Sequence, residues 1–190
     1  MHTRLPNPPV IPFGGLLLVA AVLGACAPDP ATAPTPARAS APALNGAPDD
    51  QSTGEAHYVA AVRRRLERAA DGLLYTSESD YPFTFFHAPA RTSAPLTVAA
   101  FRDAAGVPAD SLVEEVSLDE FFARHIERVD PNDPAAVALV PRYEALKREL
   151  RATVRQPRVF RVGRIAVRCY AVGVDAFGNV TGLETMAIET

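Results

Sequence analysis

The chain ends in the stretch Arg158-Val-Phe-Arg-Val-Gly-Arg-Ile-Ala-Val-Arg-Cys-Tyr-Ala-Val-Gly-Val-Asp-Ala-Phe-Gly-Asn-Val-Thr-Gly-Leu-Glu-Thr-Met-Ala-Ile-Glu-Thr190. Three parts of it, residues 159–162, 165–174 and 180–188, are rich in β-branched residues, which favours strands. Gly178-Asn179 is a strong turn signal between the last two parts. The stretch therefore predicts an antiparallel β-meander that runs almost to the end of the chain.

A long helix is predicted directly before this meander. Asp133-Pro134 is a good helix start, because proline is tolerated in the first turn. Pro141 falls inside the segment, where it should kink the helix or delay its start to about residue 140. The apolar stripe of the helix consists of Leu139, Tyr143, Leu146, Leu150 and Val154.

Further upstream, capping signals predict more helices. Ser52-x-x-Glu55 and Ser117-x-x-Glu120 both have the capping-box pattern, and the second precedes Phe121 and Phe122. Between them we expect a helix up to Gly72, a polar loop over 76–80, a β-like run over 83–87, a short helix over 97–105 and a short strand over 112–116. Strands and helices in this order predict an α+β domain over residues 55–190, with an antiparallel sheet covered by helices.

The N-terminus has the features of an export signal. An apolar stretch from Val10 to Leu23 is too short and too broken to span a bilayer, and it leads into Leu23-Gly24-Ala25-Cys26. That tetrapeptide resembles a bacterial lipobox, in which the cysteine is acylated and becomes the mature N-terminus. Residues 1–25 are therefore expected to be a lipoprotein signal peptide and Cys26 the lipid anchor. The alternative is a plain signal peptide with Cys26 incidental.

The predicted anchor leads into an Ala/Pro-rich segment, residues 26–54, that shows no apolar periodicity. Such a segment cannot bury a core and is expected to be an extended linker. Residue 27 is Ala rather than Asp, which in a Gram-negative host favours the outer membrane. We therefore expect a domain tethered in the cell envelope, on the periplasmic side of the outer membrane.

The charge and the cysteine content exclude few classes of function. The net charge of −3 is mildly acidic, which argues weakly against direct nucleic-acid binding and is equally compatible with mere solubility. Of the two cysteines, Cys169 lies in an apolar run that reads as a buried strand, and there is no C-x-x-C spacing. We expect no disulfide, no metal site of the protein's own and no cofactor.

No familiar catalytic pattern is present, so we expect no enzyme. There is no G-x-S-x-G, P-loop, dinucleotide fingerprint or H-E-x-x-H. Glu78 and Asp80 could form a glycosidase pair, but two acids on one loop are weak support. The arginine-rich run over 63–68 is interpreted as a solvated helix face rather than a phosphate site. The three histidines expected in the domain, each in a separate element and interpreted as structural or solvated, are His57, His87 and His125.

Two features of the sequence remain as candidates for a functional site. The first is the acidic segment Leu74-Tyr-Thr-Ser-Glu-Ser-Asp-Tyr-Pro-Phe83, which by itself reads as a helix-to-strand connection. The second is the C-terminus, where the terminal carboxylate, the Thr190 hydroxyl and Glu189 follow an ordered strand. These hard oxygen donors suit a magnesium-type ion or an arginine-lined cleft, although an ordinary chain end would look the same.

These two features, together with several other segments, resemble the sequence of a known protein family. The segment 71–83 looks like the signature of the nuclease A inhibitor family, small proteins that block a non-specific, metal-dependent DNA/RNA endonuclease. Segments 118–124, 156–163 and 178–190 agree with the family in the same order, so the resemblance covers roughly residues 55–190.

The resemblance implies an α-β-α sandwich that wedges into the active-site cleft of its target. It implies that Glu78 contacts the nuclease and that Thr190 approaches the catalytic metal of the nuclease. A carboxylate and a hydroxyl would then occupy sites that normally hold phosphate oxygens. The expected partner is a sugar-non-specific nuclease. The alternative is an envelope protein-binding module that keeps this fold but recognises a partner other than a nuclease.

Overall fold

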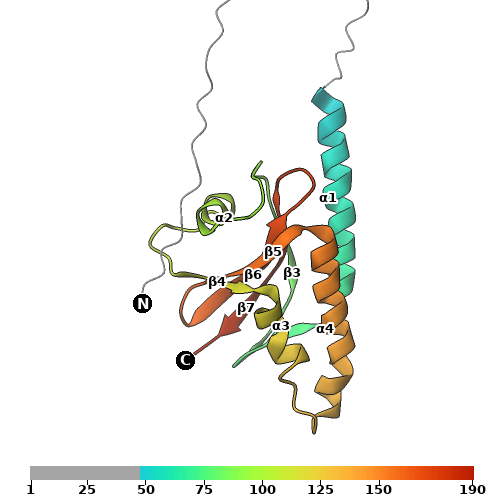
Figure 1. Ribbon diagram of the computed structural model, residues 1–190, viewed down its shortest axis with the longest axis vertical. Helices are drawn as coiled ribbons and strands as arrows, with labels where there is room; N and C mark the ends of the chain where they lie inside the picture. Colours follow the sequence, from blue (N-terminus) through green and yellow to red (C-terminus); the bar gives the residue numbers. More distant parts are fainter. Residues whose placement is uncertain (1–47) are drawn as a thin grey trace, which may run out of the picture. The chain divides into compact units, whose positions relative to one another are not determined.

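The computed structural model describes residues 48–190, which form four helices and seven strands (Figure 1). In chain order they are α1 (Pro48–Ala70), β1 (Leu74–Thr76), β2 (Asp80–Pro82), β3 (Thr84–Ala88), α2 (Val98–Ala105), β4 (Val113–Ser117), α3 (Leu118–Ile126), α4 (Pro134–Thr153), β5 (Arg155–Val162), β6 (Ala166–Val174) and β7 (Val180–Ile188). The predicted α+β class is confirmed.

The main sheet has five antiparallel strands in the order β3-β7-β6-β5-β4. The last three strands form the predicted meander, with Val174 opposite Val180 across the turn and Ala166 opposite Ile188 at the other end. Gly178 has a φ of 86°, a left-handed conformation that glycine adopts without a steric penalty. On its other side β7 pairs with β3 over residues 180–184, whereas residues 185–188 pair with β6.

Helices cover both faces of the main sheet. One core joins α1, α3 and α4 to the sheet face that carries Val159, Cys169 and Leu183. A second core packs Phe101 of α2 against the opposite face, where its ring stacks on Phe160 at 4.3 Å between centroids. Figure 1 shows α2 on one side of the sheet and α1 and α4 side by side on the other. The α-β-α sandwich is therefore confirmed.

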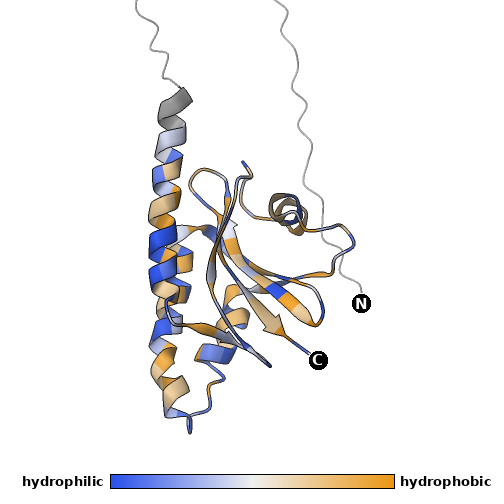
Figure 2. Cartoon of the chain, turned by 180° about the vertical axis from the view of Figure 1, so that it is seen from behind, coloured by the Kyte–Doolittle hydropathy of each residue, from blue (hydrophilic) through white to orange (hydrophobic). Residues whose placement is uncertain are grey.

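Local sequence signals explain most helix ends. Thr97, Ser117 and Asp133 are the N-caps of α2, α3 and α4, and each side chain accepts hydrogen bonds from the backbone of the following turn. α2 ends at Gly106, which has a left-handed φ of 64°. In Figure 2 hydrophobic and hydrophilic residues alternate along α1 and α4, as expected of helices with one buried side.

One helix start differs from the expectation, whereas α4 starts at the expected Asp133-Pro134 signal. α1 begins at Pro48 rather than Ser52, so residues 48–54, expected to be linker, are helical. Proline at the first helical position has no N–H to leave unpaired, and Glu55 accepts a hydrogen bond from Asn179 Nδ2 at 2.7 Å. α4 begins at Pro134 and runs through Pro141, which is exposed. The start is therefore not delayed to residue 140.

The segment 74–83 is not the expected loop. Leu74–Thr76 and Asp80–Pro82 pair antiparallel as β1 and β2, which makes a β-hairpin with Ser77-Glu78-Ser79 at its tip. Each strand is only three residues long, too short for an alternating pattern to be recognised in the sequence.

Cys169 lies in β6 as expected and is 1% exposed. Burial raises the pKa of its thiol to about 11, so the thiol stays protonated and unreactive near neutral pH. Cys26, the predicted signal peptide and the predicted linker up to residue 47 lie outside the described residues. Within residues 48–190, no helix is both long and apolar enough to cross a membrane.

Candidate functional site

The tip of the β1–β2 hairpin is shaped by its two serines. The Ser77 hydroxyl donates a hydrogen bond to the Ser79 carbonyl at 2.9 Å, and the Ser77 N–H donates to the same oxygen at 3.2 Å. Between them Glu78 is exposed. The backbone of the tip is thus closed on itself and presents the Glu78 carboxylate to solvent.

The same tip is attached to the end of the last strand. The Ile188 N–H donates to Ser77 Oγ at 2.9 Å, and the Glu78 N–H donates to the Ile188 carbonyl at 3.3 Å. Ser77 therefore uses one hydroxyl to accept from β7 and to donate within the tip. This places the hairpin tip beside the final residues of the chain.

The two residues that the sequence singled out meet here. Thr190 Oγ1 donates a hydrogen bond to Glu78 Oε1 at 2.5 Å, across 112 residues of sequence. Both residues are exposed. The structure thus brings together a carboxylate and a hydroxyl in one exposed cluster, which we call the acidic tip (Ser77, Glu78, Ser79 and Thr190).

Three contacts hold the base of the hairpin. Tyr143 of α4 donates its hydroxyl to the Leu74 carbonyl at 2.6 Å, and Arg124 Nη1 of α3 donates to the Thr76 carbonyl at 2.7 Å. The ring of Tyr75 stacks on Phe121 at 4.6 Å between centroids. Because the hairpin is tied to two helices and to β7, the acidic tip is positioned by the whole domain.

Glu189 has a different role from the one expected. The sequence suggested that it is presented together with Thr190, but its Oε1 accepts a hydrogen bond from Arg161 Nη2. Arg161 also donates through Nη1 to Glu114 of β4 at 2.8 Å. Burial lowers the pKa of Arg161, but the carboxylates of Glu189 and Glu114 outweigh this effect and raise it above its ordinary value. Glu189 therefore anchors the chain end to the sheet.

The other polar residues singled out in the sequence do not join this cluster. His57 is exposed on α1, His87 Nδ1 lies 2.9 Å from Thr181 Oγ1, and His125 is buried against α4. Arg63 pairs with Glu67 one turn along α1, on an exposed face, as expected for a solvated helix surface. In the part of the chain that the structure describes, no group of three or more His, Cys, Asp or Glu side chains could hold a metal ion.

Sequence reasoning missed Ser77 and Arg161. Both act through partners far away in the chain: Ser77 is bonded to Ile188, 111 residues on, and Arg161 to Glu189, 28 residues on. Local periodicity carries no signal for such pairs. The serine did stand inside the acidic segment, but its role follows only from the antiparallel position of β7.

The comparison with protein families agrees with this geometry. The model of the nuclease A inhibitor-like protein family matches residues 60–190 of this chain. The matched range includes the β1–β2 hairpin and the last residues of β7. The chain belongs to this family. The description of the family suggests nuclease inhibition in general, with a nuclease as the general class of partner. No curated protein matched the chain.

Proposed function

We propose that this nuclease A inhibitor-like chain is a lipid-tethered inhibitor that inserts its acidic tip into the active site of a sugar-non-specific, metal-dependent nuclease. The observation that carries the proposal is the hydrogen bond between Thr190 and Glu78, which joins two exposed oxygen-bearing groups in one cluster. Family membership supports the nuclease as the class of partner.

The chemistry of the acidic tip matches what such a nuclease binds. A phosphodiester offers negatively charged oxygens to a metal ion and to basic side chains. The Glu78 carboxylate can replace phosphate oxygens opposite arginine or lysine. The Thr190 hydroxyl and the terminal carboxylate are hard donors of the kind that magnesium prefers. The tip thus competes with the substrate for the same ligands, while containing no bond that the enzyme can hydrolyse as a phosphodiester.

Preorganisation supports tight binding. Immobilising a flexible side chain or loop on association costs free energy, and a tip that is already ordered avoids much of that cost. Ser77 fixes the hairpin tip to Ile188, and Arg161 fixes Glu189 to the sheet. We therefore expect a dissociation constant of about 1 nM or below.

The proposed lipid on Cys26 restricts where the partner is met. A chain anchored in the outer membrane and facing the periplasm can meet a nuclease during secretion or on entry from outside. Direct binding to nucleic acid forms no part of the proposal. The domain would act by occupying the enzyme, without catalysis and without a cofactor.

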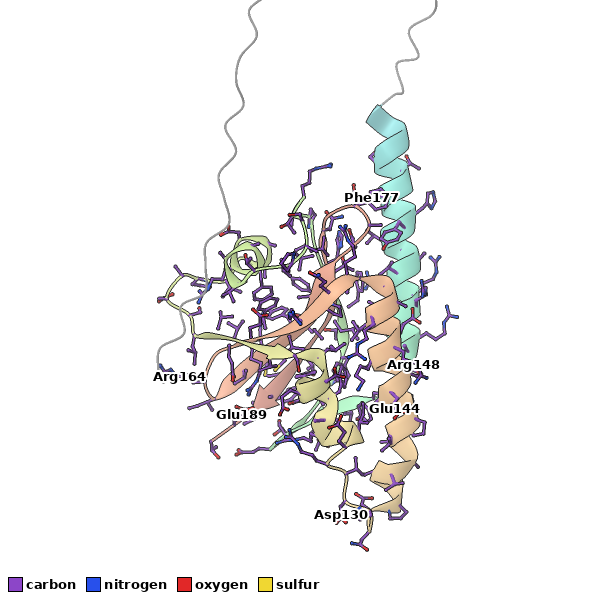
Figure 3. All side chains as sticks on the ribbon, viewed as in Figure 1. Asp130, Glu144, Arg148, Arg164, Phe177 and Glu189 are labelled. Carbon is purple, nitrogen blue, oxygen red and sulfur yellow. The ribbon has the colours of Figure 1, made fainter. Side chains whose placement is uncertain are left out.

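The test is inhibition of a purified nuclease of this class by the chain and two variants. Glu78→Ala and deletion of Thr190 should each weaken inhibition roughly 30-fold or more, because truncating one partner of a buried charge pair costs about 2 kcal/mol or more. Glu144→Ala removes an exposed acid on α4 and serves as the matched control, which should inhibit like the parent (Figure 3). Full inhibition by both tip variants would contradict the proposal.

A further inference from the structure

The turn between β5 and β6 lies at the same end of the domain as the acidic tip. The Glu189 N–H donates a hydrogen bond to the Ile165 carbonyl at 2.9 Å, so the turn stands beside the last two residues of the chain. Figure 3 shows Arg164 of this turn near Glu189, and Phe177 of the β6–β7 turn at the opposite end of the sheet. The β5–β6 turn is therefore a direct neighbour of Thr190.

This turn presents an apolar side chain to solvent. Ile165 is 66% exposed, the largest exposed fraction among the large hydrophobic residues of the described chain. Leu112, which precedes β4, follows at 50%, and its carbonyl accepts a hydrogen bond from the Gly163 N–H of the same turn at 3.1 Å. Single exposed hydrophobic side chains are common on protein surfaces. Here, however, the two most exposed ones come from segments that are hydrogen-bonded to each other, and we call Leu112 and Ile165 the apolar pair.

Gly163 gives the turn a fixed shape. Its φ is 114°, and a Cβ atom at this position would come within 2.6 Å of the Ala166 carbonyl oxygen. The turn can therefore close this tightly only with glycine. The hydrogen bonds to Leu112 and Glu189 hold it on both sides. A side chain on such an ordered turn loses little backbone freedom when a partner covers it, which favours binding.

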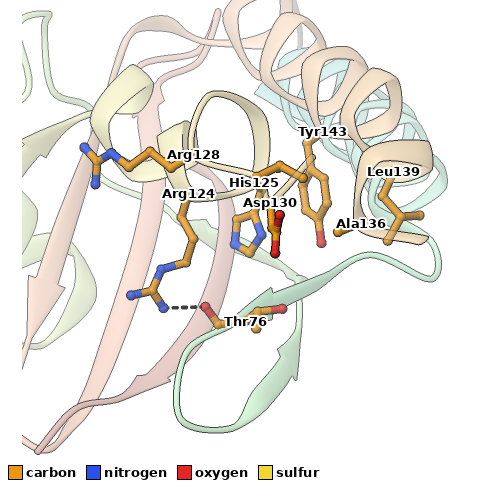
Figure 4. A pocket seen from close by; sticks show the side chains of 9 residues that line it. Thr76, Arg124, His125, Arg128, Asp130, Ala136, Leu139 and Tyr143 are labelled. Carbon is orange, nitrogen blue, oxygen red and sulfur yellow. Dashed lines mark hydrogen bonds between the residues drawn. The ribbon is translucent and has the colours of Figure 1, made fainter. Parts of the chain in front are cut away.

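The other flank of the hairpin is charged rather than apolar. Figure 4 shows Arg124 of α3 reaching the Thr76 carbonyl, with Arg128 on the same helix, and Arg128 pairs with Glu120. Exposed charges of this kind add little to affinity. Leu74 is 40% exposed but lies at the base of the hairpin rather than at its tip. Within residues 48–190, the strongly exposed large apolar side chains beside the tip are thus those of the apolar pair.

The acidic tip is too small to form a stable interface alone. A stable interface takes about 20–30 residues from each partner, and its fully buried centre is more apolar than its periphery. All four residues of the tip are polar. Tight binding therefore needs apolar contact next to the tip, because an interface is a continuous surface.

We propose that the nuclease covers Ile165 as an apolar anchor beside the acidic tip, with Leu112 at the edge of the contact. This inference rests on the proposed function and specifies the partner further. The nuclease should carry an apolar surface next to its metal site, on the side that faces the β5–β6 turn. A nuclease whose active-site cleft is bordered only by charged groups would not match this chain.

The experiment measures inhibition of a purified nuclease of this class by the chain and its variants. Ile165→Ser should raise the inhibition constant about 30-fold, which corresponds to about 2 kcal/mol. Ile165→Met keeps an apolar side chain of similar volume and should inhibit nearly like the parent. Leu112→Ser should raise the inhibition constant by a smaller factor, about threefold, because Leu112 lies further from Thr190 across the sheet.

Phe177→Ser is the matched control. It also replaces an exposed apolar side chain on a turn of β6, but at the other end of that strand, about 25 Å away by the rise of a strand. It should inhibit like the parent. Thermal unfolding of each variant shows that it is folded, since Phe177 also contacts the Tyr58 ring at 5.2 Å between centroids. Ile165→Ser should unfold close to the temperature of the parent, because its side chain is already exposed in the folded chain.

A salt series shows whether the contact is apolar. The loss of inhibition in Glu78→Ala should shrink as salt is raised from about 0.1 M to about 1 M, because salt screens charges. The loss in Ile165→Ser should stay the same or grow over this range, because burial of apolar surface does not depend on charge. A loss in Ile165→Ser that disappears at high salt would contradict an apolar contact.

Unchanged inhibition by Ile165→Ser, together with weakened inhibition by Glu78→Ala, would overturn this inference and leave the proposed function standing. Equal losses in Ile165→Ser and Phe177→Ser would also overturn it, since the effect would then not belong to this end of the domain. A parent chain that inhibits no nuclease of this class would remove the proposed function and this inference with it. Sedimentation of the chain alone covers the remaining occupant: a dimer that Ile165→Ser dissociates would mean that a second copy, and not the nuclease, covers the apolar pair.

Discussion

The hydroxyl of Thr190 and the carboxylate of Glu78 form a direct hydrogen bond of 2.5 Å, linking the last residue of the chain to the tip of a hairpin 112 residues earlier. Neither residue is attached to the core by its own side chain. Their relative position is set by Ser77 and Ile188, which join the hairpin tip to the end of β7. The protein thus presents two distant parts of the sequence as one group.

Ser77 is the residue on which this arrangement depends most. Ser77→Ala removes two hydrogen bonds, each worth about 1 kcal/mol, so inhibition of the nuclease should weaken about tenfold. Ser111→Ala, away from the acidic tip, is the matched control, because Ser111 contributes its carbonyl to Arg102 and this survives the change. The measurement is the inhibition constant of each variant against the nuclease. Equal inhibition constants for the two variants would rule out the positioning role of Ser77.

Arg161 should matter through Glu189. Arg161→Gln removes the charged donor that ties Glu189 to the sheet, a bond on the order of 1.5 kcal/mol, so inhibition should weaken about tenfold. Arg158→Gln changes a neighbouring arginine on β5 that pairs with Glu115 and should have little effect. If both variants inhibit like the parent, the chain end does not need this anchor.

The pH dependence of stability should reflect His125. The ordinary pKa of 6.5 applies to the unfolded chain, and burial together with Arg124 lowers it to about 4 in the folded protein. Between these values only the unfolded chain binds the proton, so stability is lost as the pH falls from 6.5 towards 4. The loss attributable to His125 is on the order of 3 kcal/mol.

Denaturant unfolding across that pH range tests this expectation. His125→Phe removes the titrating group while keeping an aromatic ring against Tyr143, so its stability should depend less on pH. His57→Ala, on the exposed face of α1, should retain the parent dependence. An identical slope for the parent and His125→Phe would show that His125 is not the group responsible.

The second core should affect stability but not inhibition. Phe101 is fully buried between α2 and the sheet, so Phe101→Ala should lower the free energy of unfolding by about 3–5 kcal/mol. The acidic tip is held through Ile188 of β7, Arg124 of α3 and Tyr143 of α4. The ring of Phe101 packs instead on Phe160 and Tyr170, on the opposite face of the sheet. Thermal unfolding gives the temperature below which the Phe101→Ala variant is folded. At such a temperature the variant should inhibit the nuclease as strongly as the parent chain. A large loss of inhibition would mean that the two faces are coupled.

Local signals predicted the parts of this fold that depend on nearby residues. The caps at Ser117 and Asp133 were expected from the capping box and the Asp-Pro pair, and the β6–β7 turn from Gly178 and Asn179. The start of α1 was predicted wrongly because the capping pattern at residues 52–55 competes with a proline at the first position of the helix.

The site was predictable only in part. Glu78 and Thr190 were named from the sequence with the help of the family resemblance, and the structure places them in contact. The residues that position them could not be found, because the bonds of Ser77 to Ile188 and of Arg161 to Glu189 form only when the sheet is assembled. The unpaired Nε2 of His125 likewise arises from packing between α3 and α4, which no local pattern encodes.

The central claim is that the acidic tip occupies the site in the nuclease that binds nucleic acid. A competition measurement with a catalytically inactive nuclease and a labelled DNA duplex tests it most directly. We predict that the chain and the DNA exclude each other, so that the apparent dissociation constant of the chain rises in proportion to the DNA concentration. A ternary complex of nuclease, DNA and this chain, with an unchanged dissociation constant, would contradict the account.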